Sequence, residues 1–194
     1  MSKLTRQDLF SLEKYAEIRD EFRARVIEHK KNRRVPLGDH AALYFEDRLT
    51  MQYQIQEMLR IEKIFEAAGI QEELDVYNPL IPDGANWKAT FMVEYADEAE
   101  RRAALARLVG IERDIWLRVD GFDPVVPIAN EDLERSTQDK TASVHFMRFE
   151  LTPAMVAAVK RGADLAAGVS HRAYQATFSP LPRAVRDSLA ADLA

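Results

Sequence analysis

Apolar residues in the first half of the chain recur at the spacing of α-helices. Near the start they are three or four positions apart, which predicts a helix with one buried stripe made of Tyr15, Ile18, Phe22 and Val26. Residues 45–69 (FEDRLTMQYQIQEMLRIEKIFEAAG) predict one long helix, which Asp47 is suited to cap and Gly69 to end in a left-handed turn. At about 1.5 Å per residue it would be on the order of 33 Å long, which suggests a central strut.

Two carboxylates lie within the apolar arcs of this predicted helix. At about 100° per residue, Glu57 and Glu62 each fall in the middle of a different apolar arc. A buried carboxylate without a partner is so costly that it must be paired, protonated or bound to a metal. One interpretation is a pair of core ion pairs or hydrogen bonds with arginines such as Arg19, Arg23, Arg118 or Arg148. The other is a polar pocket lined by both glutamates that binds a ligand or a metal.

The second half of the chain is rich in predicted strands, so the fold class is α+β. Residues 87–95 alternate between apolar and polar as a half-buried strand does, whereas in the first half residues 34–45 predict a small β-hairpin. From Trp87 the predicted order is strand, helix, strand, strand, strand, helix, strand. That order is close to the ferredoxin-like arrangement, a mainly antiparallel sheet with helices on one face.

A break in regular structure predicts where the two halves meet. Prolines and a glycine cluster in residues 78–84, NPLIPDG. We therefore expect a helical N-terminal half with the long helix and the hairpin (residues 1–80) and an α+β half (residues 81–194). The length also fits one compact domain.

His145 is the best single polar candidate of the second half. It lies in a predicted strand on the same face as Met147 and Phe149, while Arg148 lies on the other face. One interpretation is a core histidine satisfied by hydrogen bonds. In the other, His145 faces Glu57 and Glu62 as a metal ligand or acid–base group, and Arg148 serves as an anion clamp.

Two segments are candidates for contact with a partner. The first is a basic run, His29, Lys30, Lys31, Arg33 and Arg34. These cations are either favourably placed at the end of a helix or form a patch for an acidic partner or a phosphate. The second segment, residues 130–141 (NEDLERSTQDKT), is polar without a hydrophobic period and predicts a loop, of a length that is often functional.

Composition narrows the function classes. A net charge of −5 argues against nucleic-acid binding. The chain has no apolar run that could cross a bilayer and no signal-peptide core, so we expect a cytoplasmic protein without a membrane segment. The absence of cysteine excludes cofactors held by thiolate ligation, and any metal would need oxygen and imidazole ligands. Common motifs of nucleotide-binding proteins, hydrolases and metalloproteases are absent, so whether the protein is an enzyme stays open. A homodimer is the default expectation.

Five blocks cover most of the chain: LTRQDLFSLEKY, FRARVIEHKKNRRVPLG, FEDRLTMQYQIQEMLRIEKI, YNPLIPDG and LERSTQDKTASVHFMRFELTP. Together they resemble an uncharacterised bacterial family, a domain of unknown function whose genes often lie beside a rubrerythrin and a cysteine-rich iron–sulfur oxidoreductase subunit. The resemblance implies a cytoplasmic role near peroxide defence or electron transfer, with these two proteins as candidate partners. It brings no established activity and no established catalytic residues.

Two functional hypotheses follow. The first is an accessory or interaction protein of a redox or peroxide-defence system, with the metal and thiol chemistry belonging to its partner. The second is a metal- or small-molecule-binding enzyme with a Glu/His site between the long helix and the sheet.

Overall fold

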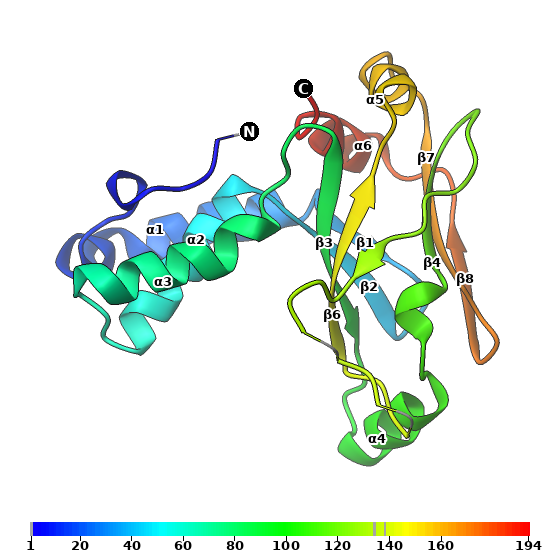
Figure 1. Ribbon diagram of the computed structural model, residues 1–194, viewed down its shortest axis with the longest axis horizontal. Coiled ribbons are helices and arrows are strands. Elements are labelled where there is room, and N and C mark those ends of the chain that lie inside the picture. The colour runs from blue at the N-terminus through cyan, green and yellow to red at the C-terminus, as the bar shows by residue number, and fades with distance from the viewer. Residues whose placement is uncertain (1, 134, 138) are drawn as a thin grey trace.

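Three helices project from two antiparallel β-sheets in the computed structural model, which describes residues 2–133, 135–137 and 139–194 (Figure 1). The helices are α1 (Leu12–Lys30), α2 (Arg48–Ile61), α3 (Ala67–Tyr77), α4 (Glu98–Arg107), α5 (Pro153–Lys160) and α6 (Arg183–Ala190). The strands are β1 (Arg34–Pro36), β2 (Ala41–Glu46), β3 (Asn86–Val93), β4 (Ile115–Val119), β5 (Ile128–Ala129), β6 (Val144–Glu150), β7 (Leu165–His171) and β8 (Tyr174–Phe178). The predicted α+β class is confirmed.

The larger sheet joins strands from both halves of the sequence. Its order is β1-β2-β3-β6-β5, and all its pairs are antiparallel. The predicted hairpin forms from β1 and β2, with Val35 opposite Leu43, and β2 continues the pairing onto β3. The hairpin therefore shares a sheet with strands from beyond residue 80, while the proposed division at that residue stays a prediction.

The remaining strands form a separate sheet of order β4-β7-β8. The predicted order of strands and helices from Trp87 is observed as far as β7, but β8 was not predicted, and the strands divide between two sheets instead of forming the single sheet of a ferredoxin-like fold. Gly168 helps to explain the pairing of β4 with β7. It lies opposite Trp116, and a Cβ atom at position 168 would lie 2.3 Å from the Trp116 ring, so only glycine leaves room for the indole.

Most of the hydrophobic core lies where the two sheets and α5 and α6 meet. Side chains that alternate along β3, such as Trp87 and Phe91, are fully buried there with Leu117 of β4 and Val169 of β7. The Trp87 indole also donates a hydrogen bond of 2.8 Å to the carbonyl of Leu189, which fixes α6 against the larger sheet.

The helices α1, α2 and α3 form a helical arm that extends away from the sheets (Figure 1). The predicted stripe of α1 is confirmed, because Tyr15, Phe22 and Val26 are buried against α2 and Ile18 packs beside them. A second cluster holds α2 against α3 and the N-terminal segment. Its buried members are Leu4, Met51, Ile55, Leu59, Leu74 and Ile81.

The predicted long helix over residues 47–69 is wrong in one respect: it is two antiparallel helices. Asp47 caps α2 as expected, but α2 ends at Ile61 and Lys63 takes the left-handed conformation with φ of 56°. The Ile64 amide then donates to the Leu59 carbonyl at 2.9 Å, which closes the helix end in a Schellman motif. Gly69 lies inside α3, where a Cβ would approach the Ile64 side chain to 2.7 Å. The apolar period continues across the turn because α3 folds back onto the same cluster.

Candidate functional site

Glu57, the first of the two predicted interior carboxylates, is held by three side chains of the arm. Arg19 donates to both of its oxygens at 2.8 and 2.9 Å, the Tyr15 hydroxyl donates at 2.7 Å, and Arg60 donates at 3.2 Å. The Arg19 guanidinium, with the Tyr15 hydroxyl and Arg60 adding to its effect against the cost of burial, lowers the pKa of Glu57 to about 2. This is the ion-pair interpretation with Arg19 as partner, and it leaves no oxygen of Glu57 free for a metal.

Glu62 is exposed, so its predicted interior position is wrong. It is the residue at which α2 ends, and the chain reverses immediately after it. The apolar arc in which it was placed assumed a helix that continues beyond Ile61. The carboxylate points into solvent instead of into the arm.

His145 is fully buried and is engaged by its own half of the chain. Its Nε2 lies 2.9 Å from the Thr141 hydroxyl and 3.0 Å from the Ala142 carbonyl, and its Nδ1 lies 3.0 Å from the Asn130 amide. The structure therefore does not bring Glu57, Glu62 and His145 to one site. Among the residues that the structure describes, no group of three or more histidine, aspartate or glutamate side chains could hold a metal ion.

The basic run from His29 to Arg34 is dispersed and does not form one patch. Lys31 is exposed and paired with Glu28, and Arg34 contacts Tyr44 and Glu94 on the outer face of the sheet. Lys30 is half-exposed, while His29 and Arg33 turn towards the interior. The reason is that the run spans the end of α1, a turn and the start of β1, so its side chains point in different directions.

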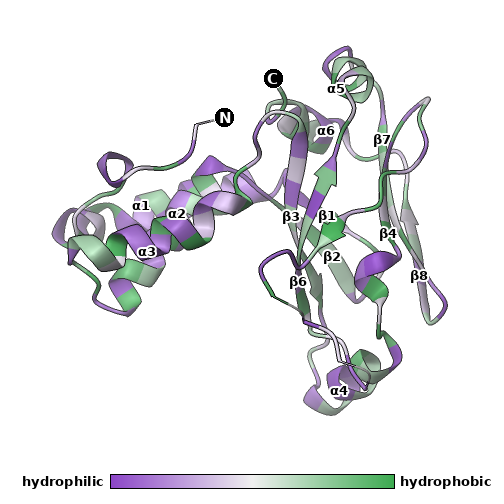
Figure 2. Ribbon diagram, in the orientation of Figure 1, coloured by the Kyte–Doolittle hydropathy of each residue, from purple (hydrophilic) through white to green (hydrophobic). Residues whose placement is uncertain are grey.

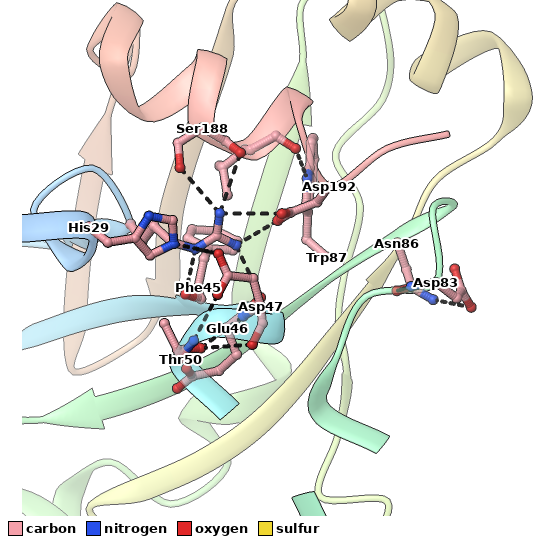
Figure 3. Close-up of polar contacts among 12 residues, drawn as sticks. His29, Phe45, Glu46, Asp47, Thr50, Asp83, Asn86, Trp87, Ser188 and Asp192 are labelled. Atoms are coloured by element: carbon pink, nitrogen blue, oxygen red, sulfur yellow. Dashed lines mark hydrogen bonds and ion pairs between the residues drawn. The ribbon is translucent and has the colours of Figure 1, made fainter. Parts of the chain in front are cut away.

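Arg33 is the centre of a buried junction between the arm, the larger sheet and the C-terminal segment (Figure 3). Its guanidinium donates to the carbonyls of Phe45 and Glu46, both at 3.0 Å, and to Asp192 at 2.6 Å. Further donors reach the Ser188 hydroxyl and carbonyl at 3.2 and 3.4 Å. Arg33 and Asp192 are each 2% exposed, so this cation is not accessible to a ligand.

Asp47 couples the junction to the start of α2. One of its oxygens accepts from the Thr50 amide at 2.9 Å, and the other lies 2.5 Å from His29 Nε2 and 3.4 Å from Arg33 Nε. Burial would raise the pKa of Asp47, but the charge of Arg33, the Thr50 amide and His29 together lower it. Burial raises the pKa of Asp192 to about 6, against the opposing charge of Arg33. Sequence reasoning missed Asp192 because 159 residues separate it from Arg33.

Arg148 lies on the wall of a cleft of about 820 Å³ between the end of α3, the outer face of the larger sheet and the side of Glu131, Asp132 and Arg135. Its guanidinium already donates to Glu131 at 2.6 and 2.8 Å and contacts Glu150. It is therefore occupied by carboxylates of its own chain and not poised as an open anion clamp. Burial, and then the charge of Arg148, lower the pKa of the neighbouring Lys88.

The predicted loop over residues 130–141 is packed in part against the sheet. Arg135 lies over the Phe146 ring, 4.6 Å from its centroid, and pairs with Asp132, and Thr141 is buried. Leu133 is exposed. Positions 134 and 138 of this loop lie outside the described residues.

The end of the arm that is remote from the sheets carries a groove of about 720 Å³ with both apolar and polar walls, here called the arm groove. Its walls come from the N-terminal segment and from the turn between α2 and α3, and include Leu9, Phe10, Leu12, Leu59, Ile64 and Ile70. Phe65 lies at its rim and is 73% exposed, and Ile61 nearby on the same turn is 60% exposed. Figure 2 shows hydrophobic residues reaching this end of the arm. No signal in the sequence separated these exposed residues from core ones, because they continue the helical period.

Comparison with known proteins gives one family and one solved structure to report. The model of the family described as "Protein of unknown function (DUF3501)" matches residues 3–193. A crystal structure of a novel protein of unknown function from Burkholderia pseudomallei K96243 is 55% identical, covers 100% of both chains and has a TM-score of 0.94. The comparison with curated proteins gives no match. In the described part of the chain, no helix has the length and apolar character to span a membrane.

Proposed function

We propose that this chain, which belongs to the DUF3501 family of unknown function, is an accessory protein that binds another protein through the arm groove. The observation that carries the proposal is Phe65, a large aromatic side chain that is 73% exposed at the rim of the arm groove. An aromatic residue beside a groove is the usual anchor of a protein–protein interface.

The turn that carries Phe65 is suited to this role because it is already ordered. The Schellman motif at Lys63 fixes the backbone, and Ile64 is inserted against Gly69, so Phe65 is held outward. A preformed contact surface loses less conformational entropy when it binds. Burial of Phe65 and Ile61 in a partner would also remove their apolar surface from water, which favours association.

The partner that we propose is a component of a cytoplasmic redox or peroxide-defence system. This part of the proposal rests on the family resemblance, which points to a rubrerythrin or to an iron–sulfur oxidoreductase subunit. The chain contains no cysteine, so thiol chemistry would belong to the partner. A second copy of the chain is the competing occupant of the groove.

The test is a binding measurement between the full chain and each of the two partner proteins from the same organism. We expect Phe65→Asp to weaken binding at least about tenfold, because a charge would replace an anchor residue. Val126→Asp is the matched control, since Val126 is also an exposed apolar residue but does not line the arm groove. Circular dichroism would verify that both variants keep the fold.

Three outcomes would overturn the proposal. The first is that neither candidate partner binds the chain. The second is that Phe65→Asp binds as tightly as the parent protein. The third is a dimer, seen by light scattering, that Phe65→Asp dissociates, because the groove would then be covered by a second copy.

A further inference from the structure

A continuous chain of hydrogen bonds runs through the region between the 3₁₀ turn Ile111–Arg113 and strand β6. Asn130 Nδ2 lies 3.0 Å from His145 Nδ1, and His145 Nε2 lies 2.9 Å from the Thr141 hydroxyl. The Thr141 hydroxyl lies 2.9 Å from that of Ser136, which donates to Glu112 Oε1 at 3.2 Å. This region is separate from the arm groove and does not depend on the function proposed above.

The groups at the ends of this chain fix the direction of its bonds. A carbonyl can only accept, so His145 Nε2, 3.0 Å from the Ala142 carbonyl, carries a proton. Burial lowers the pKa of His145 and so favours the neutral ring, in which Nδ1 carries no proton and accepts from the NH₂ of Asn130. At the other end the Glu112 carboxylate accepts from Ser136, so Thr141 donates to Ser136 and accepts from His145.

Two acceptors are left over once these bonds are assigned. Glu112 Oε2 and Asn130 Oδ1 are buried and have no hydrogen-bond partner within the described residues. Glu112 is only 4% exposed, yet its nearest cation, Arg113 Nε, is 3.8 Å away on a largely solvated side chain. A buried carboxylate oxygen without a donor is costly, and within residues 2–133, 135–137 and 139–194 no donor satisfies it.

Both groups line a hollow of about 340 Å³, together with Arg113, Pro127, Ala129 and Ser136. We infer that this hollow binds a small primary amine, whose ammonium donates to Glu112 Oε2 and Asn130 Oδ1. An ammonium group supplies three donors and a positive charge, which are what the carboxylate and the amide oxygen lack. Pro127 and Ala129 offer an apolar wall to the carbon chain of the ligand.

A divalent metal ion fits the same hollow less well. Hard cations such as Ca²⁺ take about six to eight oxygen ligands, often from several carboxylates, whereas among the described residues Glu112 alone lines this hollow with a carboxylate. The volume also exceeds the roughly 30 Å³ share of one water molecule about tenfold. Water could satisfy the hydrogen bonds but would add no positive charge beside Glu112, whose neighbour Arg113 is largely solvated.

The test is an NMR titration of the full chain in phosphate buffer near neutral pH, with the Asn130 side-chain amide and the backbone amide of Glu112 as probes. Propylamine is the ligand, and 1-propanol is its neutral match in size and shape. We expect propylamine to shift both signals with saturation and 1-propanol to bind at least about tenfold more weakly. Glu112→Gln should weaken propylamine binding by a similar factor, whereas Glu98→Gln, at an exposed position on α4, should not.

The comparison of amine with alcohol uses the unaltered protein, so it decides the matter even if Glu112→Gln fails to fold. Equal binding of the two compounds, or no binding of either, would overturn the inference. So would Mg²⁺ or Ca²⁺ shifting the same signals when propylamine does not. A crystal grown with propylamine that contains only ordered water beside Glu112 would overturn it as well.

Discussion

Glu57 in the arm and Glu112 beside the larger sheet are both largely withdrawn from water, but their surroundings differ. Glu57 receives hydrogen bonds from two arginines and a tyrosine, so both oxygens are satisfied and the charge is neutralised. Glu112 receives one neutral hydrogen bond at one oxygen and none at the other within the described residues. A carboxylate with a full set of partners, such as Glu57, stabilises the fold. A carboxylate with too few partners, such as Glu112, would be stabilised by a bound ligand that supplies the missing donors. The two glutamates therefore differ more in how many hydrogen-bond donors and cations surround each carboxylate than in how deeply each is buried.

The junction around Arg33 should give the largest effect. In Arg33→Leu, Asp192 and Asp47 would lose the cation that faces them in a buried site. We expect the free energy of unfolding to fall by about 3–5 kcal/mol, as when one partner of a buried ion pair is removed. Urea denaturation at neutral pH measures it. Arg34→Leu, at a half-exposed pair on the next residue, should cost about 1 kcal/mol or less, and equal losses for the two variants would contradict the junction.

Glu57→Gln should give the next largest effect. The amide keeps the shape but turns an NH₂ towards the arginines that now donate to the carboxylate, so donors would face donors. We expect a loss of about 1–3 kcal/mol in the free energy of unfolding at neutral pH. Glu62→Gln is the matched control, because that exposed glutamate should change stability by less than about 0.5 kcal/mol.

The pH dependence of the free energy of unfolding tests the ion pair of Glu57 in a second way, because protonation removes the charge without changing the side chain. The pKa of Glu57 is about 2 in the folded protein, below its ordinary value of 4.5. Its stabilisation is therefore fully present above pH 4.5 and is lost as the pH falls towards about 2. The difference between the parent protein and Glu57→Gln should shrink over that range. A difference that is constant with pH would show that the carboxylate charge is not the stabilising element.

Glu112→Gln should give the smallest effect and the opposite sign. This substitution removes a buried charge whose neighbouring cation, Arg113 Nε at 3.8 Å, lies on a largely solvated side chain, and it keeps an acceptor for the Ser136 hydroxyl. We expect the free energy of unfolding to stay the same or to rise by about 1 kcal/mol or less. Thermal denaturation of the parent protein, Glu112→Gln and Glu57→Gln under the same conditions measures the difference in stability. A loss as large as that of Glu57→Gln would mean that Glu112 has a stabilising partner after all.

The sequence predicted the elements whose signals are local. The stripe of α1, the hairpin of β1 and β2, and the alternation of β3 all depend on neighbouring residues, and each is observed. The long helix was misjudged because Lys63, not a glycine, adopts the left-handed conformation that ends α2.

The sites were harder to predict than the elements because they depend on distant contacts. Glu57 and Glu62 looked alike on a helical projection, and only the turn after Ile61 separates the partnered residue from the exposed one. Asp192 and Glu112 carried no signal, since neither belongs to a recognisable sequence motif. His145 was identified as a polar residue on an apolar face, but its partners lie in a loop whose structure has no sequence period.

The pairing of Arg33 with Asp192 sets the order in which the native state can be completed during synthesis. Arg33 leaves the ribosome long before Asp192, and the hairpin that surrounds it can form while the rest of the chain is still being made. Until Asp192 emerges, the guanidinium lacks its closest carboxylate, and α6 cannot dock on Trp87. The contact that ties Arg33 to the C-terminal segment can therefore form only after the rest of the hairpin and both sheets have been synthesised.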